Sequence, residues 1–196
     1  NIYRGKVSRV LPGMQAAFVD IGLDKAAFLH ASDIVIHNEV VGEVSTSHIE
    51  KHDIRDLVRD GQDIVVQVVK DPIGTKGARL TTDITIPSRY LVFMPSVTHV
   101  GVSQRIEDEA ERERLKELVA EFCDEEGGFI LRTAAEGVSQ PELKADAAFL
   151  RRLWSKIQQR MKKRRSHVLY EDLPLARRVL RDFVGTELDR IRIDSN

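Results

Sequence analysis

Short runs of alternating apolar and polar residues, separated by turn residues, constrain the fold of the first 86 residues. Residues 2–10 alternate with a period near two, which indicates a strand that buries one face. Further short strands are predicted over residues 16–22, 26–30, 63–69 and 78–84. A polar stretch with little periodicity, residues 35–52, reads as a long loop after the third strand. Five short strands with this long connection predict a small closed barrel of the OB type.

From Pro87 onward the pattern changes to helices mixed with strands. Apolar residues at spacings of three and four predict helices over residues 107–122, 141–163 and 173–183. Apolar runs predict strands over residues 90–95, 100–103, 129–133 and 191–193. The fold class is therefore α+β, with a barrel domain of residues 1–86 followed by a second, mixed domain of residues 87–196.

The charge of the chain is nearly balanced but unevenly distributed. Thirty Lys and Arg residues against 31 Asp and Glu residues give a net charge of −1, which excludes a uniformly basic nucleic-acid binder. Residues 107–126 carry ten acids and three bases, whereas residues 151–165 carry eight bases and no acid. The basic run fits contact with RNA phosphates, and it fits equally well a solvated helix end that complements the helix dipole.

Cysteine content and hydropathy limit the cellular setting. The one cysteine, Cys123, excludes an internal disulfide framework and a Cys-rich zinc site, and it fits a reducing compartment such as the cytoplasm. No apolar run approaches the roughly 18 residues that suggest a membrane span. The chain begins with Asn1 inside a strand pattern, so we expect it to be a piece of a longer protein.

The predicted barrel carries aromatic and basic residues that suit single-stranded nucleic acid. OB barrels bind single strands by stacking bases on exposed aromatic rings, with cations along the phosphates. We expect such a surface to comprise Phe18, Phe28, His30, Lys76 and Arg79. The alternative from the pattern alone is that both phenylalanines belong to the core. Likewise, the loop around Lys76 is either a phosphate-binding loop or an ordinary hairpin turn.

A second candidate site lies at the end of the strand predicted over residues 129–133. A guanidinium presents a planar fork to phosphate oxygens, and a neighbouring hydroxyl adds a donor. Arg132 and Thr133 would hold a terminal phosphate in this way, and the alternative is a simple surface arginine. No triad order, nucleophile elbow or dense carboxylate cluster indicates a catalytic centre.

Several segments resemble the ribonuclease E/G family: residues 1–7, 16–22, 24–33, 75–82, 88–95 and 131–137. The resemblance covers essentially the whole chain. It implies an S1 RNA-binding domain of OB fold over residues 1–86 and the larger part of an RNase H-like domain, without RNase H activity, over residues 87–196. The family comprises bacterial endoribonucleases that cut single-stranded, AU-rich RNA, with roles in 5′-end maturation of 16S ribosomal RNA and in mRNA decay.

The resemblance also implies roles for single residues. Phe18, Phe28 and Lys76 match the RNA-contacting positions of the S1 domain, and His30 fits a histidine common on S1 surfaces. Arg132 and Thr133 match a pocket that senses an RNA 5′-monophosphate, with a backbone contribution from Val92. Ser88 occupies a position of this pocket that is glycine in one branch of the family. A monophosphate fits a closed fork of donors, whereas a triphosphate is larger and more highly charged.

The resemblance places the family's catalytic and metal-binding residues outside this chain. The aspartates that hold Mg²⁺ and the cysteine motif that holds Zn²⁺ at the oligomer link have no counterpart here. We therefore expect the chain to bind single-stranded RNA, including rRNA precursor and mRNA, without cleaving it and without contacting membranes. We expect the full-length enzyme to be a homodimer or larger. The alternatives are a stand-alone S1-type RNA-binding protein without nuclease activity and a protein-interaction module.

Overall fold

The computed structural model describes residues 1–35, 52–123, 127–163, 167–183 and 190–192 of the chain. Of the loop predicted over residues 35–52, residues 36–51 lie outside the described residues. The strand predicted over residues 191–193 is wrong for Ile191 and Arg192, which have no regular structure, and Ile193 is not described.

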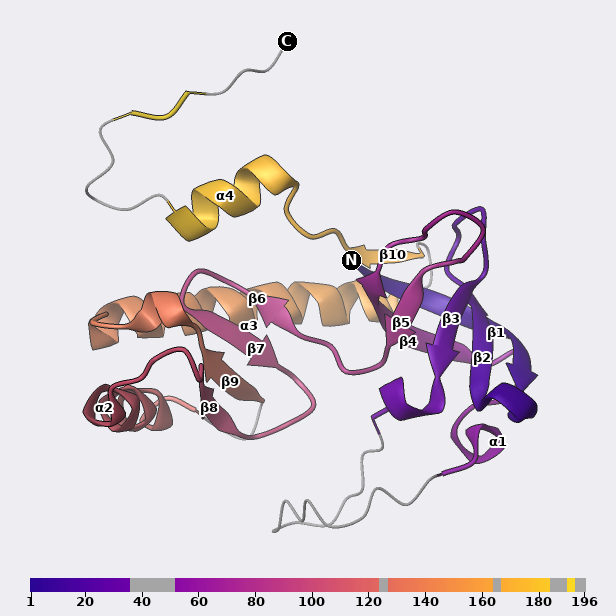
Figure 1. Ribbon diagram of the computed structural model, residues 1–196, viewed down its shortest axis with the longest axis horizontal. Helices are drawn as coiled ribbons and strands as arrows, with labels where there is room; N and C mark the ends of the chain where they lie inside the picture. Colours follow the sequence, from indigo (N-terminus) through magenta and orange to yellow (C-terminus); the bar gives the residue numbers. More distant parts are fainter. Residues whose placement is uncertain (36–51, 124–126, 164–166, 184–189, 193–196) are drawn as a thin grey trace.

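The first five strands of the barrel follow the predicted runs closely. They are β1 (Ile2–Leu11), β2 (Ala16–Asp20), β3 (Ala27–His30), β4 (Asp63–Lys70) and β5 (Arg79–Thr81). Their order is β1-β2-β3-β5-β4, and β4 pairs back onto β1, which closes the barrel as predicted (Figure 1).

Alternation along these strands builds the barrel core. Val7, Val19, Leu29 and Leu80 point inward and are almost completely buried, because alternate residues of a strand share one face. The short helix α1 (Ile54–Leu57) contributes Ile54 to the same core, and Asp53 caps it by accepting a hydrogen bond from the backbone N–H of Arg55 at 2.9 Å. The outward positions of β2 and β3 are thereby free for another role.

The second half of the chain forms a four-stranded sheet with helices, as the mixed pattern predicts. Its strands lie in the order β6-β7-β9-β8, where β6 is Ile86–Pro87, β7 is Leu91–Met94, β8 is Val100–Val102 and β9 is Gly128–Leu131. The helices are α2 (Glu109–Ala120), α3 (Gln140–Lys162) and α4 (Leu175–Phe183). None of the helices in the described ranges is long and apolar enough to cross a membrane.

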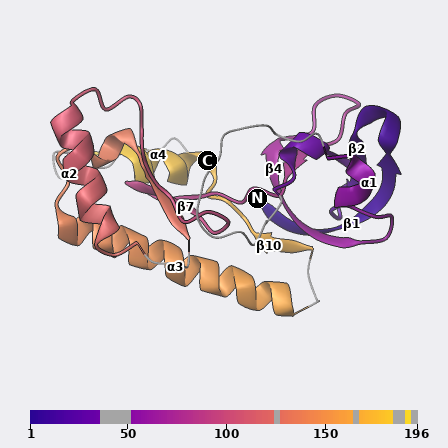
Figure 2. The same ribbon diagram turned by 90° about the horizontal axis from the view of Figure 1, so that it is seen from below.

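A strand that the sequence pattern does not predict connects the two halves. β10 (Val168–Tyr170) follows α3 and pairs antiparallel with the start of β1. Ile2 in β1 accordingly packs into the core of the second half, together with Leu169. Figure 2 shows α3 running along one side of the molecule, from the second sheet to the barrel. The barrel is therefore attached to the second unit by a shared sheet edge as well as by the chain.

Candidate nucleic-acid interface

A row of cationic and aromatic residues crosses the outer face of the barrel. The strand register places Arg9 opposite Phe18, Phe18 opposite Phe28, and Phe28 opposite Arg79. Arg79 in turn lies opposite Lys70 of β4. Two aromatic rings thus lie side by side with cations on both flanks, across all five strands of the barrel. We call these five residues the aromatic row.

Both phenylalanine rings belong to the outer face and not to the core. Phe18 and Phe28 are half-buried, whereas the residues on either side of each in its strand are fully buried. The two rings meet edge to face, with centroids 6.4 Å apart. His30 continues the surface, with its ring centroid 6.5 Å from that of Phe28. This geometry leaves ring surface and edges available to a base from solvent.

The two other residues predicted for this surface are Lys76 and Arg79, of which Arg79 belongs to the row. Lys76 is exposed on a tight turn in which its backbone exchanges hydrogen bonds with that of Ile73, so the loop has the form of an ordinary hairpin turn. Gly77 follows, and a Cβ there would lie 1.9 Å from the carbonyl oxygen of Ala26, so only glycine lets β5 approach β3 this closely. Arg79 forms an ion pair of 3.0 Å with Asp33 and remains half-exposed.

The second candidate site centres on the guanidinium of Arg132, at the end of β9. Its Nη1 donates to the backbone carbonyls of Ser88 and Arg89, the latter at 3.2 Å, and to Oδ1 of Asp182 at 2.7 Å. Arg181 donates to both oxygens of the same carboxylate, at 2.9 and 3.1 Å. These hydrogen bonds from Arg181 and Arg132 hold the pKa of the Asp182 carboxyl well below its usual range. We call Arg132, Arg181 and Asp182 the arginine clamp.

A carboxylate on α3 fixes the turn that supports Arg132. Oδ2 of Asp146 accepts hydrogen bonds from the hydroxyl of Ser88 at 2.5 Å, from the backbone N–H of Tyr90 at 3.0 Å and from that of Leu91 at 3.1 Å. Ser88 itself is buried. The carbonyls that receive the Arg132 guanidinium are therefore held in place by a helix 56 positions along the chain from Tyr90.

The other residues predicted for this pocket are placed differently from Arg132. Thr133 is exposed, and its hydroxyl lies 3.3 Å from that of Ser103, at the end of β8. Val92 is the second residue of β7 and pairs with Pro87 and Ile130 on its two sides, so it lies one residue in from the sheet end that leads to Arg132. The structure thus joins Arg132 directly to Ser88 by a hydrogen bond, and it places Thr133 and Val92 near the same sheet end.

The segment after Thr133 is tied to α2 by a second carboxylate. Glu111 accepts hydrogen bonds from Arg114 at 2.6 and 2.7 Å and from the backbone N–H of Gly137 at 2.8 Å. These bonds, the Arg114 pair foremost, lower the pKa of the Glu111 carboxyl from 4.5 to about 2. A carboxyl whose pKa is depressed by folding stabilises the folded state above its unfolded pKa, and this contribution is lost as the pH falls through the folded pKa.

We expect Glu111→Gln to lower the free energy of unfolding at pH 7 by about 1 kcal/mol, because a charge-assisted hydrogen bond is weakened. The difference from wild type should shrink as the pH is lowered from 5 toward 2, the range over which Glu111 itself becomes protonated. Urea unfolding at pH 7, 5 and 3 measures this trend. Glu113→Gln is the matched control, since that exposed carboxylate pairs with Lys116 on the same helix. A difference that stays constant with pH would contradict the assigned role of Glu111.

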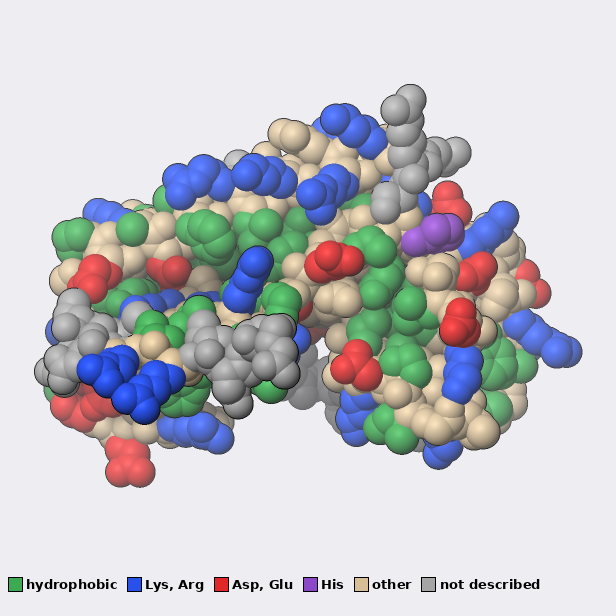
Figure 3. Space-filling model, turned by 90° about the horizontal axis from the view of Figure 1, so that it is seen from above, with side chains coloured by type: hydrophobic (Ala, Val, Ile, Leu, Met, Phe, Trp, Pro, Cys, Tyr) green, Lys and Arg blue, Asp and Glu red, His purple; other side chains and the backbone are tan. Residues whose placement is uncertain are grey.

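The basic run predicted on the second long helix forms an exposed strip. Figure 3 shows Lys and Arg side chains in a row along one edge of the helical half of the molecule. A groove between the C-terminal half of α3 and β10 is lined in part by Lys156, Arg160, Lys163 and Tyr170. Of the predicted run, Arg164 and Arg165 lie outside the described residues. The strip reaches the side of the barrel where β10 joins β1.

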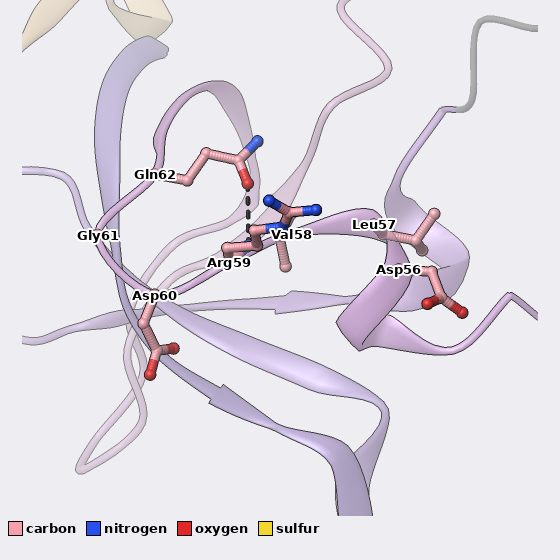
Figure 4. Close-up of a pocket in the computed structure, with 7 residues that line it drawn as sticks. All are labelled: Asp56, Leu57, Val58, Arg59, Asp60, Gly61 and Gln62. Carbon is pink, nitrogen blue, oxygen red and sulfur yellow. Dashed lines mark hydrogen bonds between the residues drawn. The ribbon is translucent and has the colours of Figure 1, made fainter.

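A hollow beside α1 has no comparable chemistry. It is lined by residues 56–62 (Figure 4), where Gln62 Oε1 accepts a hydrogen bond from the backbone N–H of Arg59 at 2.9 Å. Asp60 accepts one from the backbone N–H of Val10 at 2.7 Å. The side chains of Gln62 and Asp60 thus hold backbone groups of the loop and of β1. Across the described ranges, no three His, Cys, Asp or Glu side chains are grouped so that they could hold a metal ion.

Five contributors to these sites are not predicted from the sequence: Arg9, Lys70, Asp146, Arg181 and Asp182. A signal for Asp146 exists, because it falls three residues after Leu143 and four before Leu150 on the apolar face of its helix. A carboxylate on a buried face requires a partner. The contacts of Asp182 have no such signal, since they depend on how α4 lies against the second sheet.

Comparison with known proteins gives a consistent result. A sequence profile of the ribonuclease E/G family matches residues 85–196. All 196 residues align with ribonuclease G of Escherichia coli strain K12 at 68% identity and with that of Haemophilus influenzae at 64% identity. Ribonuclease E of Nostoc sp. is 38% identical over 198 residues, and the chain covers 28% of its length. The chain spans 40% of the length of the two ribonuclease G relatives.

Proposed function

The chain belongs to the ribonuclease E/G family, and from this premise we propose that it is the part of a bacterial endoribonuclease that holds RNA and senses its 5′ end. In this proposal residues 1–86 are an S1 domain that binds single-stranded, AU-rich RNA. Residues 87–196 are part of an RNase H-like domain that carries a pocket for a 5′-monophosphate at Arg132. The RNA passes over the barrel while its 5′ end is bound at the second unit.

The aromatic row is the observation that carries this proposal. Stacking needs π surfaces that accept any base, and phosphates need cations at either side of the bases. Phe18 and Phe28 supply the first, and Arg9, Arg79 and Lys70 supply the second. His30 extends the same surface, and Lys76 adds a cation on the exposed turn between β4 and β5. A purely structural row would not need two half-buried rings on the solvent side of a barrel whose core is already filled.

The Arg132 site supports the second part of the proposal. A guanidinium that is oriented by two backbone carbonyls has lost much of its freedom before a ligand arrives. Its remaining N–H groups present donors to a phosphate dianion in a preset direction. Thr133, which follows Arg132 in the chain, and the backbone of Val92, near the same sheet end on β7, would complete the pocket.

The wider setting is part of the proposal and is taken from the family. The substrates are rRNA precursor, including the 5′ end of 16S rRNA, and mRNA undergoing decay, in the bacterial cytoplasm. The whole protein acts as a homodimer or larger assembly. Mg²⁺ for cleavage and Zn²⁺ for assembly are held by residues that are not among those of this chain.

The proposal is tested by titrating the chain against fluorescent AU-rich oligomers of one sequence, with either a 5′-monophosphate or a 5′-hydroxyl. We expect both to bind and the phosphorylated oligomer to bind more tightly. Equal affinity for the two oligomers would contradict the sensor, and no binding of either would contradict the whole proposal. The stand-alone S1-type protein, which remains the second candidate because the barrel alone supplies the aromatic row, predicts equal affinity.

Binding without cleavage is a separate expectation. We expect the phosphorylated oligomer to stay intact for hours when incubated with the purified chain and Mg²⁺, because hydrolysis assisted by Mg²⁺ needs carboxylates placed around the ion. Denaturing gel electrophoresis of the oligomer measures this. Cutting that persists after repurification, and that chelation of Mg²⁺ abolishes, would contradict the expectation.

We also expect Arg9→Ala to weaken RNA binding and to reduce the slope of log K against log salt concentration by about 1, which corresponds to one phosphate contact. Arg9 lies opposite Phe18 and is exposed, so its removal should leave the barrel folded. Titrations at four salt concentrations measure the slope. Lys116→Ala on α2 is the matched control, and it should leave the slope unchanged. An unchanged slope in Arg9→Ala would remove Arg9 from the interface.

A further inference from the structure

The arginine clamp resembles an anion-binding site in which the bound anion is a side chain of the protein, the carboxylate of Asp182. Two guanidinium groups, from Arg132 on the second sheet and Arg181 on α4, converge on the single carboxylate of Asp182. Arg181 also donates to the carbonyl of Pro87 at 3.3 Å, next to the turn that receives Arg132. Two arginines around one anion is the arrangement that proteins use for phosphate groups.

The charges of the clamp are unequal. One carboxylate carries a single negative charge and two guanidiniums carry two positive charges. A phosphate monoester at neutral pH carries about −1.5 to −2 and offers three acceptor oxygens. A 5′-monophosphate would therefore neutralise the two arginines more fully than Asp182 does. A phosphodiester within the RNA chain carries one negative charge only, and a 5′-hydroxyl carries none.

The helix that carries Asp182 is held to the sheet by few contacts. Its large apolar side chains are mostly exposed, with 77% of Leu175, 47% of Val179 and 74% of Phe183 accessible to solvent. Among the described residues, the side-chain hydrogen bonds that join α4 to the second sheet and its turns come from Arg181 and Asp182. The Asp182 side chain is partly exposed on this loosely packed helix, so it can turn away from Arg132 while Arg181, on the same helix, stays beside the turn at Pro87.

We propose that Arg181 and Asp182 are specificity-determining residues of the 5′-end pocket: Asp182 occupies the anion position in the free protein, and the RNA 5′-monophosphate displaces it and is bound by both Arg132 and Arg181. This inference rests on the proposed function of the Arg132 site. It adds Asp182 as an anion that competes with the phosphate and Arg181 as a second residue that binds it. Asp182 keeps singly charged internal phosphates out of the pocket. Only a terminal phosphate, with its higher charge, displaces Asp182, so the pocket distinguishes the 5′ end of the RNA from its interior.

The test uses the same pair of 5′-phosphorylated and 5′-hydroxyl oligomers on variants of the intact chain. Asp182→Asn is expected to increase the affinity for the phosphorylated oligomer by about tenfold, since the competing charge is gone, and to leave the affinity for the hydroxyl oligomer unchanged. Arg181→Gln is expected to decrease the affinity for the phosphorylated oligomer by about tenfold. Glu113→Gln is the matched control, because that exposed carboxylate on α2 pairs with Lys116 and takes no part in the clamp.

The outcomes separate this inference from the function on which it rests. If wild type does not prefer the phosphorylated oligomer, the proposed function itself fails. If wild type shows the preference and Asp182→Asn leaves it unchanged or reduces it, Asp182 orients Arg132 and does not compete with phosphate, and the inference is overturned. A preference that survives Arg181→Gln unchanged would exclude Arg181 as a ligand. Circular dichroism melts of each variant report whether α4 and the sheet remain folded.

Discussion

Replacing Phe28 by alanine is expected to weaken the binding of single-stranded RNA by about 1–3 kcal/mol, which is roughly 5- to 150-fold in Kd. Phe28 lies at the centre of the aromatic row, in edge-to-face contact with Phe18 and near His30. Its removal deletes one stacking surface and leaves the neighbouring ring without its partner. The preference for a 5′-phosphate should be unchanged, because Arg132 follows β9 in the second sheet, and Figure 1 shows that sheet apart from the barrel strands β2 and β3. Fluorescence anisotropy titrations with both oligomers measure affinity and preference together.

Phe149→Ala is the matched control for this change. Phe149 is 50% exposed on α3, away from the barrel strands, so the same chemical deletion is made outside the proposed surface. We expect its effect on RNA affinity to be below twofold. Equal losses in the two variants would show that Phe28 has no special part in binding. We expect both variants to change the melting temperature by a similar amount, since both rings are partly exposed.

Replacing Arg132 by glutamine is expected to abolish the preference for the 5′-monophosphate while leaving the affinity for the 5′-hydroxyl oligomer close to wild type. A hydrogen bond between charged groups contributes about 1.5–3 kcal/mol. This energy corresponds to a preference of roughly 10- to 150-fold for the phosphorylated oligomer in wild type, which the variant should lose. Arg132→Lys keeps the charge but loses the planar fork. It should therefore recover only part of the preference.

The control for Arg132 is Arg59→Ala, which removes an exposed arginine from the barrel loop beside α1. This variant should keep the 5′-phosphate preference. A loss of affinity for both oligomers in Arg132→Gln would instead indicate that the turn at Ser88 has rearranged. A full preference in Arg132→Gln would show that the terminal phosphate binds elsewhere.

The barrel is the part of the fold that the sequence predicts best, for a physical reason. Each strand buries alternate residues in one core, so the positions of Val7, Val19 and Leu29 within their strands show which face of each strand points into the barrel. The outward position of Phe18 and Phe28 follows once Ala17 and Leu29 are assigned to the core. Pattern alone leaves the two phenylalanines undecided, because phenylalanine is common in cores. Only the register across β2 and β3 shows that they meet.

The contacts around Arg132 are beyond sequence reasoning because they are long-range. Asp182 lies 50 positions from Arg132, and Asp146 lies 58 positions from Ser88. Such pairs depend on how helices pack on the sheet, and a single sequence holds no periodicity that reports it. β10 escapes prediction for a similar reason. It has three residues, and the edge of β1 with which it pairs is more than 160 positions earlier in the chain.

The central claim is that one chain binds RNA at two distinct places, bases on the barrel and the 5′-phosphate at Arg132. Amide chemical-shift mapping by NMR on the isotope-labelled chain tests it most directly, with the two AU-rich oligomers compared at saturation. The account predicts that both oligomers shift amides around Phe18, Phe28 and His30, and that only the phosphorylated one shifts those around Ser88, Arg132 and Asp182. Identical shifts from both oligomers, or shifts that avoid the outer face of β2 and β3, would contradict it.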